Sequence, residues 1–141
     1  AWLWKIEAIA RNGYSETLTA AVGGFEYTLY KVGESAADLG LLLEYQYYGR
    51  SELEPFTTAD NDVCVGARFA LNDAQDTSVL AGVAWDTETG ETFFNVEAER
   101  RIGDSIALEL RARAFSGAGP RDLTYAVVRD DYVQIQLAKY F

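Results

Sequence analysis

Apolar and polar residues alternate along most of this chain. In the last segment Val133, Ile135, Leu137 and Phe141 share one parity of position, and only Lys139 interrupts that apolar series. The intervening positions carry the other side chains of the segment, namely Tyr132, Gln134, Gln136, Ala138 and Tyr140. Successive side chains of a β-strand point to opposite faces, so a period of two predicts a strand with one apolar face.

The same alternation recurs seven more times towards the N-terminus. It predicts eight strands, over residues 1–11, 15–31, 38–50, 62–72, 78–85, 93–102, 105–115 and 132–141. Segment 15–31 reads as one long strand with a weak point at Gly23-Gly24. No internal repeat or low-complexity linker divides the chain, so residues 1–141 are predicted to form a single domain.

Turn-forming residues separate the segments. They lie at Asn12-Gly13, 32–35, 72–75, Thr89-Gly90 and Gly103-Asp104, and two longer connections cover 51–60 and 117–128. Both prolines, Pro55 and Pro120, fall in those connections. Good helix formers in 1–11, 35–48 and 95–115 leave an α-containing fold as a local alternative, but alternation and β-branched and aromatic content favour strands. The pattern predicts an all-β, antiparallel, up-and-down β-barrel of about eight strands.

The charged residues on the polar side of the strands help to distinguish a membrane barrel from a soluble one. A membrane barrel turns its apolar side to lipid and its polar side to the lumen. Acidic and basic residues are mixed there in nearly equal numbers. The set is Lys5, Glu7, Arg11, Glu26, Glu44, Arg68, Glu97, Glu99, Arg101, Glu109, Arg111 and Arg113. Such mixing indicates pairing across strands inside a water-poor lumen, where an unpaired charge is costly. Cross-strand pairs on a water-facing sheet are the alternative.

Aromatic residues on the apolar side gather towards both ends of the predicted strands. Counted back from a periplasmic C-terminus, one belt contains Trp2, Trp4, Phe25, Tyr27, Phe69 and Phe141, and the other contains Tyr45, Tyr47, Trp85 and Phe94. Two aromatic belts around an aliphatic band are typical of a transmembrane β-barrel, because amphipathic rings prefer the headgroup level. The same count puts the two long connections 51–60 and 117–128, together with 86–91, on the outer side.

The C-terminal strand resembles that of Gram-negative outer-membrane β-barrel proteins. Residues 130–141 read DDYVQIQLAKYF, and the alternating Val133, Ile135 and Leu137 before the final Phe141 match the signal that the barrel assembly machinery reads in that family. Lys139 departs from the pattern, since an aromatic is common there. The resemblance implies a bacterial outer-membrane location and an assembly-machinery partner.

Three further stretches resemble the last strands of larger porin-like proteins of proteobacteria. They are GGFEYTLY at 23–30, ADLGLLLEY at 37–45 and GARFALND at 66–73. This second resemblance implies that the chain is the C-terminal part of a longer barrel, or engineered from one, as an alternative to a complete small barrel. It implies no particular solute.

Composition excludes several kinds of function. The 141 residues carry 22 acidic and 12 basic side chains, and a net charge of −10 argues against a nucleic-acid partner. Histidine is absent, which excludes a Ser-His-Asp triad and the His-dependent chemistry of barrel enzymes. The single cysteine, Cys64, is interpreted as a small residue that fills space on the polar face, and its role stays open. We expect no enzyme activity, no cofactor and no metal site.

Paired carboxylates such as Glu97 and Glu99 are read as parts of a salt-bridge network with nearby arginines. The acidic loop residues suggest either cation-bridged contact with lipopolysaccharide or a solvated rim. They are Glu52, Glu54, Asp60, Asp86, Glu88, Glu91, Asp122, Asp130 and Asp131.

Bulky residues on the polar side favour a filled lumen, because an eight-stranded barrel has an interior just wide enough for its side chains. The first expectation is therefore a small monomeric outer-membrane barrel that contacts membrane lipid and lipopolysaccharide, with a structural or interaction role and no free solute conduction. The alternative is a fragment or variant of a larger porin-like channel for passive diffusion of small solutes. A soluble ligand-binding β-barrel is a second alternative.

Overall fold

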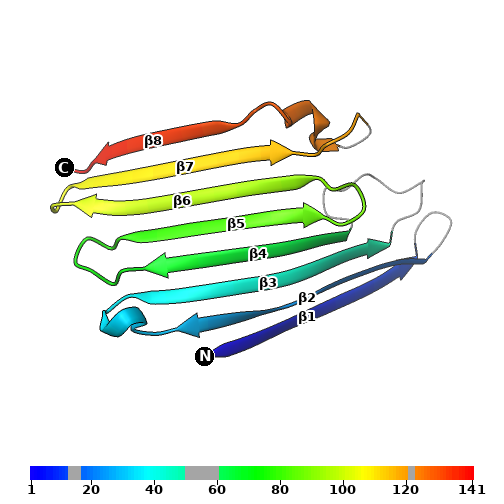
Figure 1. Cartoon of the computed structure of the whole chain (residues 1–141), viewed down its shortest axis with the longest axis horizontal. Helices are drawn as coiled ribbons and strands as arrows, with labels where there is room; N and C mark the ends of the chain where they lie inside the picture. The colour runs from blue at the N-terminus through cyan, green and yellow to red at the C-terminus, as the bar shows by residue number, and fades with distance from the viewer. Residues whose placement is uncertain (13–16, 50–60, 121–122) are drawn as a thin grey trace.

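Eight antiparallel strands form one sheet in the computed structural model, which describes residues 1–12, 17–49, 61–120 and 123–141. The strands are β1 (Trp2–Asn12), β2 (Thr17–Leu29), β3 (Asp38–Gly49), β4 (Asn61–Ala70), β5 (Ser78–Asp86), β6 (Thr92–Ile102), β7 (Ile106–Ser116) and β8 (Tyr132–Lys139). Each strand pairs with the next one along the chain, so the spatial order follows the sequence (Figure 1). The predicted all-β, up-and-down arrangement is confirmed.

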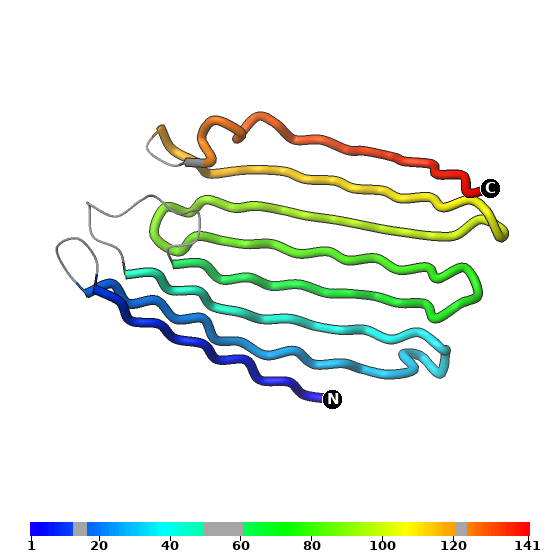
Figure 2. Tube along the Cα trace, turned by 180° about the vertical axis from the view of Figure 1, so that it is seen from behind, coloured from blue at the N-terminus to red at the C-terminus, as the bar shows by residue number. Residues whose placement is uncertain are grey.

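The sheet is open. Within the described residues β1 pairs with β2 and β8 pairs with β7, and these two strands lie at opposite edges (Figures 1 and 2). The prediction that eight strands close into a barrel is therefore wrong for this structure. Closure needs a particular strand tilt and stagger around the ring, and alternation in the sequence specifies the faces of a strand but neither of those quantities.

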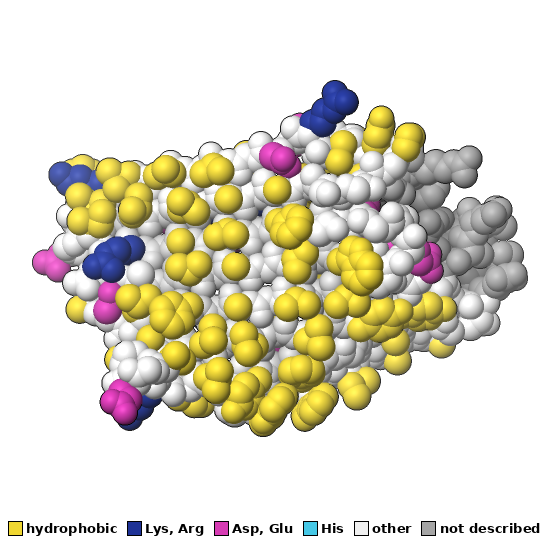
Figure 3. Space-filling model, viewed as in Figure 1, with side chains coloured by type: hydrophobic (Ala, Val, Ile, Leu, Met, Phe, Trp, Pro, Cys, Tyr) yellow, Lys and Arg dark blue, Asp and Glu magenta, His cyan; other side chains and the backbone are white. Residues whose placement is uncertain are grey.

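Alternation assigns the two faces of the sheet consistently. Ala67, Ala81 and Val96 are successive cross-strand partners on one face, whereas Arg68, Leu80 and Glu97 are partners on the other. Figure 3 shows the first face, where hydrophobic side chains spread over the strands and charged groups appear towards the margins. We call it the apolar face, and the opposite one the polar face.

No packed core lies under either face in the described part of the chain. Leu18 and Ala37 are the hydrophobic residues that are buried there, and large apolar side chains such as Ile6 and Trp4 are 86% and 68% exposed. Among the described residues the sheet is a single layer, with no helix or second sheet packed against it (Figure 2). Contiguous apolar surface of this extent marks a face that a membrane or another protein covers.

Turn-forming residues occupy the described connections as predicted, and two of these connections also contain a short 3-10 turn. Gly90 and Gly103 have positive φ angles of 77° and 63°, which a residue without a Cβ adopts without strain. Short 3-10 turns occupy Val32–Glu34, as part of a predicted turn, and Leu123–Val127, inside a predicted loop. The α-containing alternative is wrong, because the described helices are these two turns. Gly13, the 51–60 loop and residues 121–122 of the 117–128 loop lie outside the described residues.

The strand β2 runs without a break through Gly23-Gly24, where the sequence suggested a weak point. The two glycines differ in their surroundings. A Cβ on Gly24 would collide with the Leu43 carbonyl oxygen and would lie 2.9 Å from the Glu44 Cα of β3. A Cβ on Gly23 would meet only the Lys5 carbonyl oxygen, at 3.9 Å. The close approach of β2 and β3 therefore depends on Gly24.

Replacing Gly24 and Gly23 by alanine, one at a time, tests whether the close approach of β2 and β3 depends on Gly24. We expect Gly24→Ala to lower the free energy of unfolding by about 1–3 kcal/mol, the usual cost of forcing an extra carbon into occupied space. The matched control Gly23→Ala should stay within about 0.5 kcal/mol of the parent. Urea unfolding in detergent, followed by tryptophan fluorescence, measures both. Equal effects of the two substitutions would contradict the close approach of the strands.

Candidate functional site: the polar face

The polar face is the candidate functional site, because most of the charged residues of the described strands lie on it. The strand registers place all twelve predicted residues of the charge set on this one face. They come from β1, β2, β3, β4, β6 and β7. That they line a lumen stays a prediction.

One group of contacts lies on β1, β2 and β3. The Lys5 ammonium forms an ion pair with the Glu26 carboxylate, diagonally across β1 and β2. On β3, the Gln46 amide donates to Glu44 Oε1 at 2.7 Å. The Arg11 guanidinium donates to the Tyr48 hydroxyl at 3.4 Å, so this bond spans from β1 to β3 over the strand between them.

A second group lies on β5, β6 and β7. Arg113 donates through Nε to Asn95 Oδ1 at 3.2 Å, and its Nη2 lies 3.9 Å from Glu97 Oε1. Arg111 donates to Glu109 on its own strand at 3.3 Å. The Ser78 hydroxyl donates to Glu99 Oε1 at 3.0 Å.

The floor between these two groups is made of small residues. Gly66 faces Gly82 across β4 and β5, and Cys64 faces Ala84. An open pocket of about 200 Å³ adjoins this floor and is lined by Arg68, Ser78, Leu80, Glu97, Ala98, Glu99, Glu109, Leu110 and Arg111. On the described part of the polar face, small residues thus occupy the middle of β4 and β5, with Arg68 and Leu80 beside them, and a group of charged side chains lies on each side.

Water has access to the charged clusters. The paired side chains Lys5, Glu26, Glu97, Glu109, Arg111 and Arg113 are 33–49% exposed. Ion pairs in such a setting contribute little stability, typically less than about 1 kcal/mol. The structure thus pairs two of the predicted charges across β1 and β2, and two across β6 and β7, but it places them in contact with solvent rather than in a dry interior.

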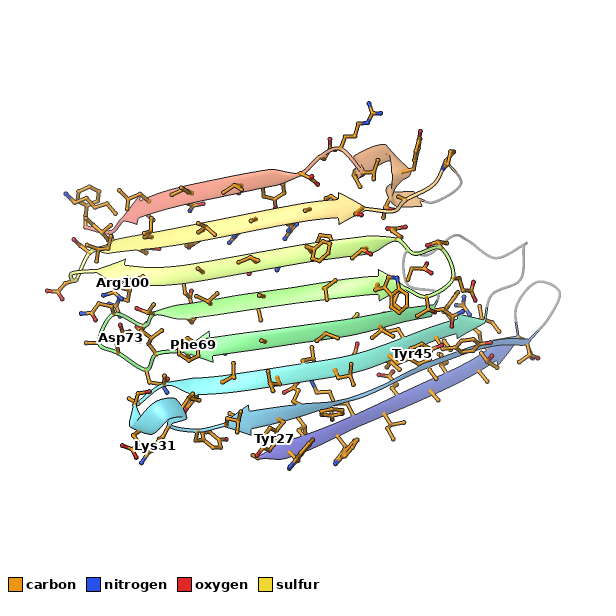
Figure 4. All side chains as sticks on the ribbon, viewed as in Figure 1. Tyr27, Lys31, Tyr45, Phe69, Asp73 and Arg100 are labelled. Carbon is orange, nitrogen blue, oxygen red and sulfur yellow. The ribbon has the colours of Figure 1, made fainter. Side chains whose placement is uncertain are left out.

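The apolar face carries the predicted aromatic residues. Near the end of the sheet that holds both termini, Trp2 lies 6.1 Å from Trp4, 5.4 Å from Phe25 and 4.4 Å from Tyr27, measured between ring centroids. Figure 4 shows Tyr27 and Phe69 towards this end and Tyr45 towards the other.

The remaining belt residues follow from their places in the strands. Tyr47 lies near the end of β3, Trp85 near the end of β5 and Phe94 near the start of β6, all towards the end opposite the termini, and Phe141 follows β8. Whether the aromatic residues serve as membrane belts stays a prediction.

A cluster that the sequence reading missed holds the β4–β5 turn. Asp73 accepts hydrogen bonds from the backbone N–H and the hydroxyl of Thr77, both at 2.8 Å, and from Arg100 at 3.3 Å. Arg101 forms an ion pair with Asp76 at 3.1 Å. Figure 4 shows Arg100 and Asp73 close together at the end of the sheet. The turn is thereby tied to the end of β6.

The backbone N–H of Thr77 lowers the pKa of Asp73, and the Thr77 hydroxyl and the Arg100 guanidinium act in the same direction. A signal for this cluster exists in the sequence. Arg100 occupies an apolar-face position, opposite Leu108, where alternation calls for an apolar residue.

Two acidic residues of the β5–β6 connection accept hydrogen bonds from different places, since Glu88 accepts one from the Asn61 amide at the start of β4 whereas Asp86 bonds within the connection. Asp86 Oδ1 accepts the backbone N–H groups of Glu88 and Thr89 at 2.7 and 2.8 Å. The predicted loop carboxylates Glu52, Glu54, Asp60 and Asp122 lie outside the described residues. In the part of the chain that the structure describes, no three His, Cys, Asp or Glu side chains are grouped to hold a metal ion. No described helix has the length and apolarity to span a membrane.

No protein-family model, curated protein or solved structure matches this chain. A functional assignment therefore depends on the residues and on the geometry of the two faces.

The Asp73 cluster makes a prediction about pH. The folded pKa of Asp73 is lowered, so its carboxylate stabilises the fold above the unfolded pKa of about 3.9, and this contribution is lost as the pH falls through the folded pKa. Asp73→Ala should lower the thermal midpoint at neutral pH, and its difference from the parent should shrink as the pH falls below about 4.

The control is Asp104→Ala in the β6–β7 turn, since the Asp104 carboxylate accepts no hydrogen bond from the described residues. This variant should change the midpoint little at either pH. A deficit of Asp73→Ala that is independent of pH would show that the carboxylate charge does not stabilise the turn.

Proposed function

We propose that this chain forms part of the wall of a transmembrane β-barrel in the bacterial outer membrane, with its polar face along a water-filled path for passive diffusion of small solutes. The observation that carries the proposal is a single open sheet with one continuous apolar face and one charged, solvent-accessible face. Lipid against one face and a water-filled lumen against the other are surroundings that suit such a sheet.

The apolar face supports the lipid side of this proposal. A soluble sheet covers its apolar face with a second layer, but the described chain supplies none. A bilayer needs no second layer, because lipid chains cover apolar side chains directly. Aromatic rings towards both ends of the strands are the residues that prefer the level of the lipid headgroups.

The polar face supports a wide lumen over a filled one. The open sheet, the small central residues Gly66 and Gly82, and ion pairs that are one-third to one-half exposed all fit a wall that faces water. The first expectation from the sequence, a closed eight-stranded barrel, would place these charges in a filled interior. The geometry therefore favours the porin-like alternative.

This role needs no catalytic residue, cofactor or metal. The contacts it requires are with membrane lipid, with lipopolysaccharide at the outer loops, and with the barrel assembly machinery during insertion. The strand β8 is suited to that last contact, since Val133, Ile135 and Leu137 are 65–71% exposed along an edge of the sheet.

Planar bilayer recording tests the proposal. The refolded protein should give large, regular conductance steps. Ala84→Arg, on the polar face, should reduce the step size by narrowing the path. Its neighbour Val83 lies on the apolar face, so Val83→Leu is the matched control and should leave the step unchanged.

Two outcomes would overturn the proposal. A heat-modifiable monomer that inserts but carries no steady current would support the small closed barrel. A protein that stays folded and monodisperse without detergent would support a soluble barrel instead.

A further inference from the structure

We infer that Arg100 and Lys139 bind the headgroups of anionic phospholipids, at the end of the apolar face where both termini lie. This inference rests on the proposed membrane location, and it names the kind of lipid and the residues that contact it. Three features of the apolar face lead to it, namely the sign and place of its charges, their apolar surroundings and the donors that they keep.

The first feature is that charge on the apolar face has one sign and one place. Among the residues that the described strands set on this face, Arg100 and Lys139 are the charged ones, and both are basic. Arg100 is the third residue from the end of β6, and Lys139 is the last residue of β8. Both strands run towards the end of the sheet that holds the termini (Figure 1). The strands therefore present a basic apolar face at one end and an uncharged one elsewhere.

The second feature is the aliphatic surface between and beside the two cations. Strand β7 separates them, with Leu108 opposite Arg100 and Ile106 opposite Lys139. Two strand spacings put the two backbones about 10 Å apart. Leu137, opposite Leu108 on its other side, continues this surface away from the sheet end. A phospholipid has the matching parts, because its headgroup is anionic and its acyl chains are apolar, whereas a free anion matches only the cations.

The third feature is that each cation is held in place and keeps donors for an anion. Arg100 donates through Nη1 to the Thr77 hydroxyl at 2.7 Å and to Asp73 at 3.3 Å. Its Nη2 and Nε have no partner among the described residues, and its side chain is 47% exposed. The Lys139 ammonium lies 5.1 Å from the centroid of the Phe141 ring and has no acidic partner within the described part of the chain.

The level of the cations favours lipid headgroups as their partners. A charge on a lipid-facing strand is costly in the hydrocarbon region, so its charged end must reach the headgroups. Figure 4 shows Arg100 towards the same end of the sheet as Tyr27 and Phe69, whose rings prefer that level. Carboxylates of this end, such as Asp73 and Asp104, lie in turns beyond the strands. The cations are therefore closer to the acyl chains than these carboxylates are.

Unfolding in vesicles of two compositions tests the inference. The full-length protein and its variants are inserted into phosphatidylcholine vesicles with and without phosphatidylglycerol. Salt is kept at about 0.15 M, where charges are screened beyond about 8 Å. Urea unfolding followed by tryptophan fluorescence gives a folding constant in each kind of vesicle. The quantity compared is the ratio of these two constants, relative to the parent, because the net charge of −10 affects the ratio of every variant.

Arg100→Gln and Lys139→Gln should each lower this ratio about fivefold, the effect of one basic residue beside an anionic membrane surface. Loss of the Arg100 bond to Asp73 acts equally in both kinds of vesicle and cancels in the ratio. The matched control is Arg101→Gln. Arg101 is the next residue and carries the same charge, but it lies on the polar face and pairs with Asp76 at 3.1 Å. This control should stay within about twofold of the parent.

Four outcomes would overturn the inference. The first is an unchanged ratio for both Arg100→Gln and Lys139→Gln, and the second is an equal loss for Arg101→Gln. The third is that inorganic phosphate, added to phosphatidylcholine vesicles at equal ionic strength, reproduces the difference between the parent and these variants, because free phosphate would then be the ligand. The fourth is a protein that inserts into neither kind of vesicle.

These outcomes separate the inference from the proposed function. A protein that inserts into both kinds of vesicle without the expected loss in the variants would overturn the lipid site alone and leave the membrane wall standing. A protein that inserts into neither would overturn both. Ion current plays no part in the measurement, so a failure of diffusion would not affect the lipid site.

Discussion

Hydrogen bonding between neighbouring strands is the interaction on which the rest of this structure depends. The described chain has almost no buried apolar side chain, so a packed core does not hold the strands together. Seven antiparallel ladders do so instead. Because each ladder fixes the register of one strand against the next, it also fixes which side chains share a face. A slip of one residue would reverse both faces of a strand.

That constraint explains why side chains on the two faces behave so differently. On the apolar face, ring contacts such as Trp2 with Tyr27 join adjacent strands without burying either residue from solvent. On the polar face, Lys5 with Glu26 and Arg113 with Glu97 join adjacent strands through charge. Neither kind of contact provides a core, and both fit a wall one sheet thick. The contacts at the ends of the wall, such as the Asp73 cluster, fix the turns against the strands.

Much of this organisation could be predicted from the sequence, because a period of two is a local property. The strand predicted at 78–85 is Ser78–Asp86, and that predicted at 93–102 is Thr92–Ile102. Properties that depend on distant residues could not be predicted in this way. The bond of Arg100 to Asp73 needs the β4–β5 turn beside the end of β6, and the requirement for Gly24 arises from a carbonyl on another strand. Whether the sheet closes depends on the tilt and stagger of all strands together, so it could not be predicted from any single segment.

The central claim is that the apolar face contacts lipid while the polar face contacts water. Spin labels placed one at a time at 79–85 along β5, in protein reconstituted in vesicles, test it most directly. Collision rates with oxygen, which concentrates in lipid, and with a water-soluble nickel complex should alternate with a period of two. The collision rate with oxygen should be the higher one at Val79, Ala81 and Val83. The collision rate with the nickel complex should be the higher one at Leu80, Gly82 and Ala84. Opposite phases, or equal access to nickel at both sets of positions, would contradict the account.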